Sequence, residues 1–163
     1  MNKKNASWLF GCVLLTLLGA CARQTDIAAG DLRIAQPWIR AIPPGAPAAG
    51  GFATIRNAGG APDRLLSASS AQAERVEVHE VQDDGGVMRM RQLRQGLAIP
   101  GGSAVELKPG GYHLMLISPK HRFAEGETIE VRLRFERAGE VAVPFGVRSM
   151  LDPGTQASGG HAH

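Results

Sequence analysis

The chain has 163 residues and a formal net charge of +3, from 18 Lys and Arg against 15 Asp and Glu. Lys3 and Lys4 lie within the first 20 residues, which hold no acidic residue, so the rest of the chain is nearly neutral. This balance argues against a protein that binds nucleic acid, and the length suits one domain with a hydrophobic core.

The first 20 residues have the pattern of a secretory signal peptide. Two lysines are followed by an apolar run from Trp8 to Leu18, which is too short for a transmembrane helix. The sequence L-G-A-C that ends at Cys21 resembles a bacterial lipobox, in which the cysteine is lipidated. We therefore expect a periplasmic lipoprotein anchored in a membrane by acyl chains. Ala22, in place of the Asp that often retains lipoproteins at the inner membrane, favours the outer membrane.

The cysteine content limits the chemistry of the mature chain. Of the two cysteines, Cys12 lies in the signal peptide and Cys21 would carry the lipid. The domain would then have neither a thiol nor a disulfide, although its compartment is oxidising. Functions that need a protein thiolate are excluded on this count.

Beyond the signal, residues 21–31 are interpreted as a lipidated tether. From residue 32 onward, short segments alternate apolar and polar residues between Gly, Pro, Asn and Asp, which is typical of strands. The clearest is 128–136, where Ile129, Val131, Leu133 and Phe135 alternate with charged residues. We predict strands over 32–39, 50–57, 64–69, 74–81, 86–93, 103–107, 111–118, 128–136 and 140–147.

The overall pattern predicts an all-β sandwich or barrel over residues 32–148. No segment shows a sustained helical period, and many short strands separated by turns are typical of that class. The prolines of 43–47 exclude a central strand there. Residues 149–163, which end in G-G-H-A-H, are expected to form a flexible tail.

Two clusters of histidine and methionine stand out from the strand pattern. One contains His79, Met88 and Met90, and the other contains His113 and Met115. Residues i and i+2 of a strand share a face, so His113 and Met115 would present their donors side by side. Such a face is unusual as a solvated surface, and it is unusual as a core because other core faces of this chain use Val, Ile, Leu and Phe.

These residues form a neutral, soft ligand set. Thioether sulfur is a poor ligand for zinc, calcium or magnesium but suits Cu(I). We therefore interpret His79, Met90, His113 and Met115 as a Cu(I) site, with Met88 as an accessory ligand. The alternative is that the methionines fill gaps in the core and the histidines lie at the surface.

The remaining histidines and two polar neighbours of the clusters are interpreted separately from the Cu(I) site. His161 and His163 could capture Cu(II), which prefers nitrogen and oxygen donors, or they could be incidental residues of a solvated tail. His121 is interpreted as an ordinary surface residue. Glu80 and Tyr112 are candidates to orient the metal-binding histidines.

The same stretches resemble the PCu(A)C family of periplasmic copper chaperones. The resemblance covers residues 32–147 and is carried by A-E-R-V-E-V-H-E (73–80), D-G-G-V-M-R-M-R (84–91), I-P-G-G-S-A-V-E-L-K-P-G-G-Y-H-L-M-L (99–116) and P-W-I-R-A-I-P-P-G-A-P (37–47). It implies a cupredoxin-like Greek-key β-sandwich or barrel with a shallow Cu(I) site at one end. It also implies that the four residues above are the ligands and that copper is delivered to the Cu(A) centre of cytochrome oxidase. One departure is Val81, where many members have methionine.

Other functions fit less well. Blue-copper electron transfer and disulfide reduction need cysteines, haem attachment lacks C-x-x-C-H, and hydrolysis lacks a nucleophile motif, so no enzyme is expected. The expected partners are a cytochrome oxidase copper subunit or another copper chaperone, with the membrane reached through the lipid. Two alternatives stay open, namely a periplasmic copper buffer or acquisition protein and a structural β-sandwich lipoprotein.

Overall fold

The computed structural model describes residues 26–149. The signal peptide, Cys21, His161 and His163 lie outside these residues. Within them the structure contains eleven strands and no helix. The strands are β1 (Ile27–Ala29), β2 (Leu32–Arg40), β3 (Ala48–Asn57), β4 (Asp63–Ser69), β5 (Ala73–Asp84), β6 (Val87–Gln92), β7 (Leu97–Ile99), β8 (Ala104–Leu107), β9 (His113–Pro119), β10 (Thr128–Phe135) and β11 (Gly139–Arg148).

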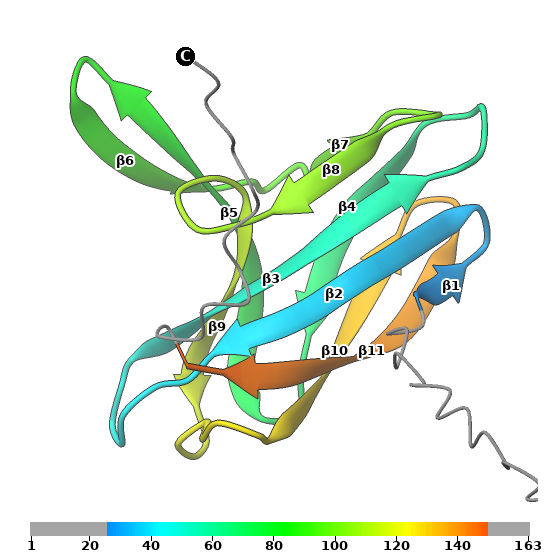
Figure 1. Cartoon of the computed structure of the whole chain (residues 1–163). Helices are drawn as coiled ribbons and strands as arrows, with labels where there is room; N and C mark the ends of the chain where they lie inside the picture. The colour runs from blue at the N-terminus through cyan, green and yellow to red at the C-terminus, as the bar shows by residue number, and fades with distance from the viewer. Residues whose placement is uncertain (1–25, 150–163) are drawn as a thin grey trace, which may run out of the picture.

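Seven of the strands close into a barrel (Figure 1). Their order is β2-β11-β10-β4-β5-β9-β3, and the ring closes because β3 also pairs with β2. The β11–β2 pairing is parallel, whereas the other neighbours in the ring run antiparallel. Several neighbours are distant in sequence, as in Greek-key folds. The predicted all-β architecture is confirmed.

The core comes from the alternation that predicted the strands. Ile129, Val131, Leu133 and Phe135 are all buried on the inner face of β10, while the residues between them are exposed. Strand β11 follows the same pattern and packs Val143, Phe145 and Val147 into the same cluster. Burial of these side chains, at roughly 1.5–3 kcal/mol each, is the main stabilising term.

All nine predicted strands are present, but two short strands were missed. Strand β1, placed in the tether by the sequence, pairs with β2 through a turn at Gly30, whose φ is +54°. Strand β7 begins directly after Gly96, whose φ is +77°, and pairs with β4. Each has three residues, too few to show a period of two. The folded domain therefore begins before residue 32.

One hairpin extends beyond the barrel. Strand β6 pairs with the second half of β5 and with no other strand of the described domain, and it projects at the upper left of Figure 1. All six residues of β6 are exposed. We call residues 79–92 the β5–β6 arm, and it carries both methionines of the first cluster.

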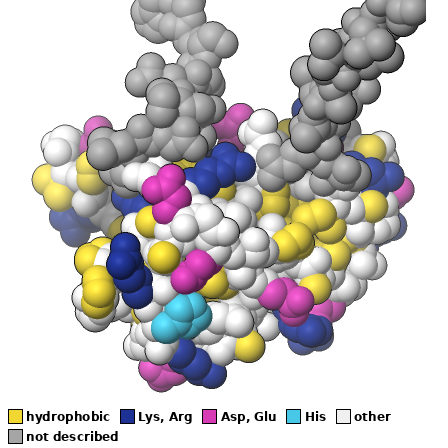
Figure 2. Space-filling view, turned by 60° about the horizontal axis from the view of Figure 1, so that its bottom comes forward, with side chains coloured by type: hydrophobic (Ala, Val, Ile, Leu, Met, Phe, Trp, Pro, Cys, Tyr) yellow, Lys and Arg dark blue, Asp and Glu magenta, His cyan; other side chains and the backbone are white. Residues whose placement is uncertain are grey.

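The surface of the domain carries charges of both signs. Figure 2 shows Lys and Arg side chains interspersed with Asp and Glu across one face, without a field of a single sign. This mixture of charges agrees with the nearly neutral net charge of the chain after its signal peptide. Between residues 26 and 149 no helix has the length and apolar character to cross a membrane.

Candidate metal centre

The register of three strands brings the two clusters together. His79 of β5 lies opposite His113 of β9, and Met115 follows two positions along β9. On the other side of β5, Met90 lies opposite Val81, which is two positions from His79. Side chains that are paired across strands, or two apart on one strand, share a face. The four predicted ligands therefore lie on one face of the sheet.

That face is the outside of the barrel. The intervening residues Val76, Val78, Leu114 and Leu116 are buried in the core, as the sequence predicted for the two leucines. The face that carries the predicted ligands is therefore opposite the core. A slip of one residue in this register would exchange the two faces, so core packing also determines where the four predicted ligands lie.

Three of the four predicted ligands line a single shallow pocket of about 340 Å³. Met90, His113 and Met115 line this metal pocket together with Val81 and the Pro109-Gly110 turn, among others. The fourth, His79, stands beside it, with its ring centroid 5.7 Å from that of His113.

The predicted ligands differ widely in exposure. The His113 residue is only 5% exposed, whereas Met90 on the β5–β6 arm is 53% exposed. Met88 lies opposite Asp83, one step farther along the arm, and it does not line the metal pocket. One wall of the metal pocket is therefore open to solvent.

His113 has one ring nitrogen occupied and one available. Its Nδ1 lies 3.0 Å from the carbonyl oxygen of Gly111. A carbonyl only accepts, so Nδ1 carries the hydrogen and Nε2 is left with a lone pair. Burial lowers the pKa of His113 below its ordinary value, the bond to Gly111 opposes this, and the nearby His79 lowers it further. The lowered pKa favours the neutral ring, which is the form that binds metals.

His79 is held in the reverse orientation. Its Nε2 lies 2.7 Å from Oε2 of Glu77, and its Nδ1 is buried without a hydrogen-bond partner. Glu77 also accepts a hydrogen bond of 2.9 Å from Nε of Arg75. The bonds from His79 and then Arg75 hold the pKa of the Glu77 carboxyl below its usual value.

Glu80 and Tyr112, the two candidates suggested by the sequence, are not the residues that orient His79. Glu80 points to the opposite side of β5, where Nη2 of Arg91 lies 2.8 Å from its Oε2 and Tyr112 is hydrogen-bonded to it. Alternation along β5 explains the difference, because Glu77 shares a face with His79 whereas Glu80 does not. The spacing Glu77-x-His79 is the feature of the sequence that could have indicated this orienting residue.

The donor set suits a soft metal better than a hard one. Among residues 26–149 no group of three or more His, Cys, Asp or Glu side chains is placed to hold a metal ion. The predicted ligand set therefore combines two imidazoles with two thioethers, which are soft donors. His121, as predicted, is a surface residue, with its side chain 49% exposed and 3.6 Å from Glu127.

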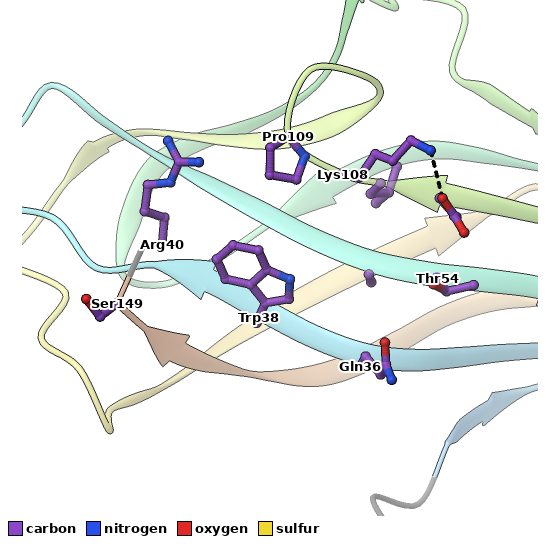
Figure 3. Close-up of a pocket in the computed structure, with 10 residues that line it drawn as sticks. Gln36, Trp38, Arg40, Thr54, Lys108, Pro109 and Ser149 are labelled. Atoms are coloured by element: carbon purple, nitrogen blue, oxygen red, sulfur yellow. Dashed lines mark hydrogen bonds and ion pairs between the residues drawn. The ribbon is translucent and has the colours of Figure 1, made fainter. Parts of the chain in front are cut away.

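A second pocket, which the sequence did not indicate, adjoins the metal pocket. It measures about 440 Å³ and shares Arg40 and Pro109 with its neighbour. Figure 3 shows Trp38 and Arg40 from β2 beside Lys108 and Pro109, which follow β8. The ring of Trp38 packs on Phe52 at 4.5 Å between centroids. Strands distant in sequence form this pocket, so no local pattern predicts it.

Comparison with known proteins places these observations in a family context. Residues 32–147 match the family described as "Putative lipoprotein LpqE-like". A "Putative lipoprotein Lxx21020" of Leifsonia xyli subsp. xyli is 33% identical over 138 residues, which are 83% of this chain and 81% of that protein.

Solved structures of the same fold carry the PCuAC name. The apo PCuAC domain from PmoF1 is 26% identical, with a TM-score of 0.65 over 76% of this chain and 98% of that domain. The copper-bound PCuAC domain from PmoF2 is 29% identical, with a TM-score of 0.65 over 76% of this chain and 97% of that domain. These similarities confirm the cupredoxin-like fold and the resemblance found in the sequence.

Proposed function

The chain belongs to the LpqE-like family of lipoproteins, and we propose that it is a membrane-anchored Cu(I)-binding metallochaperone. The similar PCuAC domain from PmoF2 is copper-bound, which supports copper as the cargo. Cys21, in the lipobox-like sequence, would be the anchor, in the periplasm and with the outer membrane favoured. No catalytic step is part of the proposal.

His79, Met90, His113 and Met115 would be the ligands. The observation that carries this assignment is the buried Nδ1 of His79, which lacks a hydrogen-bond partner. It belongs to a ring whose centroid is 5.7 Å from that of a second imidazole, on the sheet face that also carries two thioethers. Bonds from a metal to imidazole nitrogen are about 2 Å long, so rings 5.7 Å apart are close enough to bind one ion. The neutral sulfur donors favour Cu(I) over harder cations.

The exposed side of the site suits a protein that passes its metal on. Met90 is more than half exposed and lies on the projecting β5–β6 arm, so an incoming ligand can reach the copper without unfolding the barrel. Without a thiolate in the site, an acceptor with cysteine ligands can compete by ligand exchange. An electron carrier would instead need a closed thiolate site.

The proposed acceptor is the Cu(A) centre of cytochrome oxidase, reached directly or through another copper chaperone. The tail residues His161 and His163 would be a separate place for Cu(II). A copper buffer or acquisition protein is the main alternative, because it would use the same site. A structural lipoprotein, by contrast, would bind no copper.

Transfer kinetics distinguish a chaperone from a buffer. The Cu(I)-loaded chain from residue 22 onward is mixed anaerobically with an apo copper subunit of cytochrome oxidase, and the copper content of each protein is followed. Direct exchange predicts a transfer rate that rises with acceptor concentration and exceeds spontaneous release. A rate equal to release into a chelator at every acceptor concentration would favour the buffer.

A further inference from the structure

We propose that Glu77 is a positioning residue that makes His79 bind the metal through Nδ1, while His113 binds it through Nε2. This inference rests on the proposed Cu(I) site and adds to it the donor atom of each histidine. Glu77 lies two positions before His79, on the same face of β5.

The contact with Glu77 determines which nitrogen of His79 is available. The Glu77 carboxylate can only accept, so the 2.7 Å contact places the hydrogen of a neutral His79 ring on Nε2. The lone pair is then on Nδ1, which is buried and has no partner. Burying a polar atom without a partner is unfavourable, and a metal ion at Nδ1 would remove that cost.

His113 is arranged with the opposite polarity. Its Nδ1 donates to the Gly111 carbonyl at 3.0 Å, so its Nε2 is the available atom. The two rings face each other across the β5–β9 pairing and are tilted by 52°. A side-chain acceptor on β5 and a backbone acceptor in the turn before β9 therefore produce two different tautomers in one site.

Glu77 is itself held by a third residue of the same row. Arg75 donates from Nε to Oε1 at 2.9 Å, while His79 occupies Oε2, so both carboxylate oxygens are engaged. Arg75, Glu77 and His79 lie at every second position of β5 and therefore share a face. The Glu77 side chain is 19% exposed. The partly buried carboxylate has few other orientations, which is what an orienting group requires.

The direct test is nitrogen NMR of the imidazole rings in the ¹⁵N-labelled chain from residue 22 onward. Long-range ¹H–¹⁵N spectra, recorded above the ordinary imidazole pKa of about 6.5, should show His79 with hydrogen on Nε2 and His113 with hydrogen on Nδ1. Anaerobic addition of Cu(I) should shift Nδ1 of His79 and Nε2 of His113. A Cu(I) shift at Nε2 of His79 would overturn the inference.

Substitutions separate orientation from simple structural support. Glu77→Leu should mix the His79 tautomers and lower Cu(I) affinity about 10–100-fold, the usual effect of losing an orienting partner. Glu77→Gln keeps an oxygen acceptor and should preserve the tautomer. Glu130→Leu is the matched control, because Glu130 is an exposed partner of Arg132 on β10 and lines no part of the metal pocket.

The outcomes distinguish this inference from the proposed function. If the unaltered chain binds no Cu(I), both fail. If it binds Cu(I) and Glu77→Leu leaves the tautomer and the affinity unchanged, only the positioning role of Glu77 fails.

Discussion

His79 and His113 lie directly opposite each other across the β5–β9 pairing, with ring centroids 5.7 Å apart. The two residues are 34 positions apart in the sequence. Their meeting depends on burial of Val78 and Leu114, the neighbouring pair on the inner face of the same strands. Barrel packing and the geometry of the proposed metal site are thus two consequences of one register.

Met90 and Met88 should differ in their effect on copper, although they are chemically identical and both exposed. Met90→Leu removes a sulfur that lines the metal pocket, and we expect Cu(I) affinity to fall at least about tenfold, or roughly 1.4 kcal/mol. Met88→Leu, one step farther along the arm, should leave it nearly unchanged. Competition titrations would measure the Cu(I) affinity of each variant, and X-ray absorption would count the sulfur atoms bound to copper.

The Met90→Leu and Met88→Leu variants also control for a loss of stability. Both residues are more than half exposed, so either substitution should change the free energy of unfolding by less than about 0.5 kcal/mol. An equal loss of copper affinity in both variants, or a loss only in Met88→Leu, would contradict the assignment of Met90.

Val81 is a position where a further ligand can be added. It lies opposite Met90 and lines the metal pocket, so the sulfur of Val81→Met would lie beside the site. We expect tighter Cu(I) binding, by about tenfold if the added sulfur contributes about 1.4 kcal/mol. Val87→Met is the matched control, because Val87 is exposed on the other face of the arm. Equal affinities in the two variants would show that position 81 does not reach the metal.

Much of this arrangement follows from alternation in the sequence. Strand β10 (Thr128–Phe135) shows four buried and four charged or polar positions, so its location and inner face could be predicted. The same alternation placed His113 and Met115 on one face. Strands β1 and β7 are too short to show it, and the Glu77–His79 bond depends on side-chain rotamers. The pocket at Trp38 depends on strands brought together only by the barrel.

Asp63 should make stability depend on pH without affecting copper. Burial raises its pKa, but hydrogen bonds from the backbone amides of Arg137, Arg64 and Ala138 outweigh this and hold it below the ordinary value of 3.8. A lowered pKa in the folded state stabilises the fold above the unfolded pKa, and the contribution is lost as pH falls through the folded pKa.

We therefore expect Asp63→Ala to lower the free energy of unfolding by about 2–3 kcal/mol near neutral pH. The difference from the unaltered chain should shrink below about pH 4. Urea denaturation over a range of pH would measure it, and Cu(I) affinity at neutral pH should stay the same because Asp63 lines no part of the metal pocket. A difference that persists undiminished in strong acid would contradict this role.

Binding of Cu(I) at the proposed site is tested most directly by an anaerobic Cu(I) titration of the chain from residue 22 onward, in competition with a chromophoric Cu(I) chelator. A parallel titration of the His113→Ala, Met115→Leu double variant isolates the site, and a chain ending at Asp152 removes the two tail histidines. We predict tight binding of one Cu(I) per chain, lost in the double variant and retained without the tail. Absence of Cu(I) binding by the unaltered chain, or equal binding by the double variant, would contradict it.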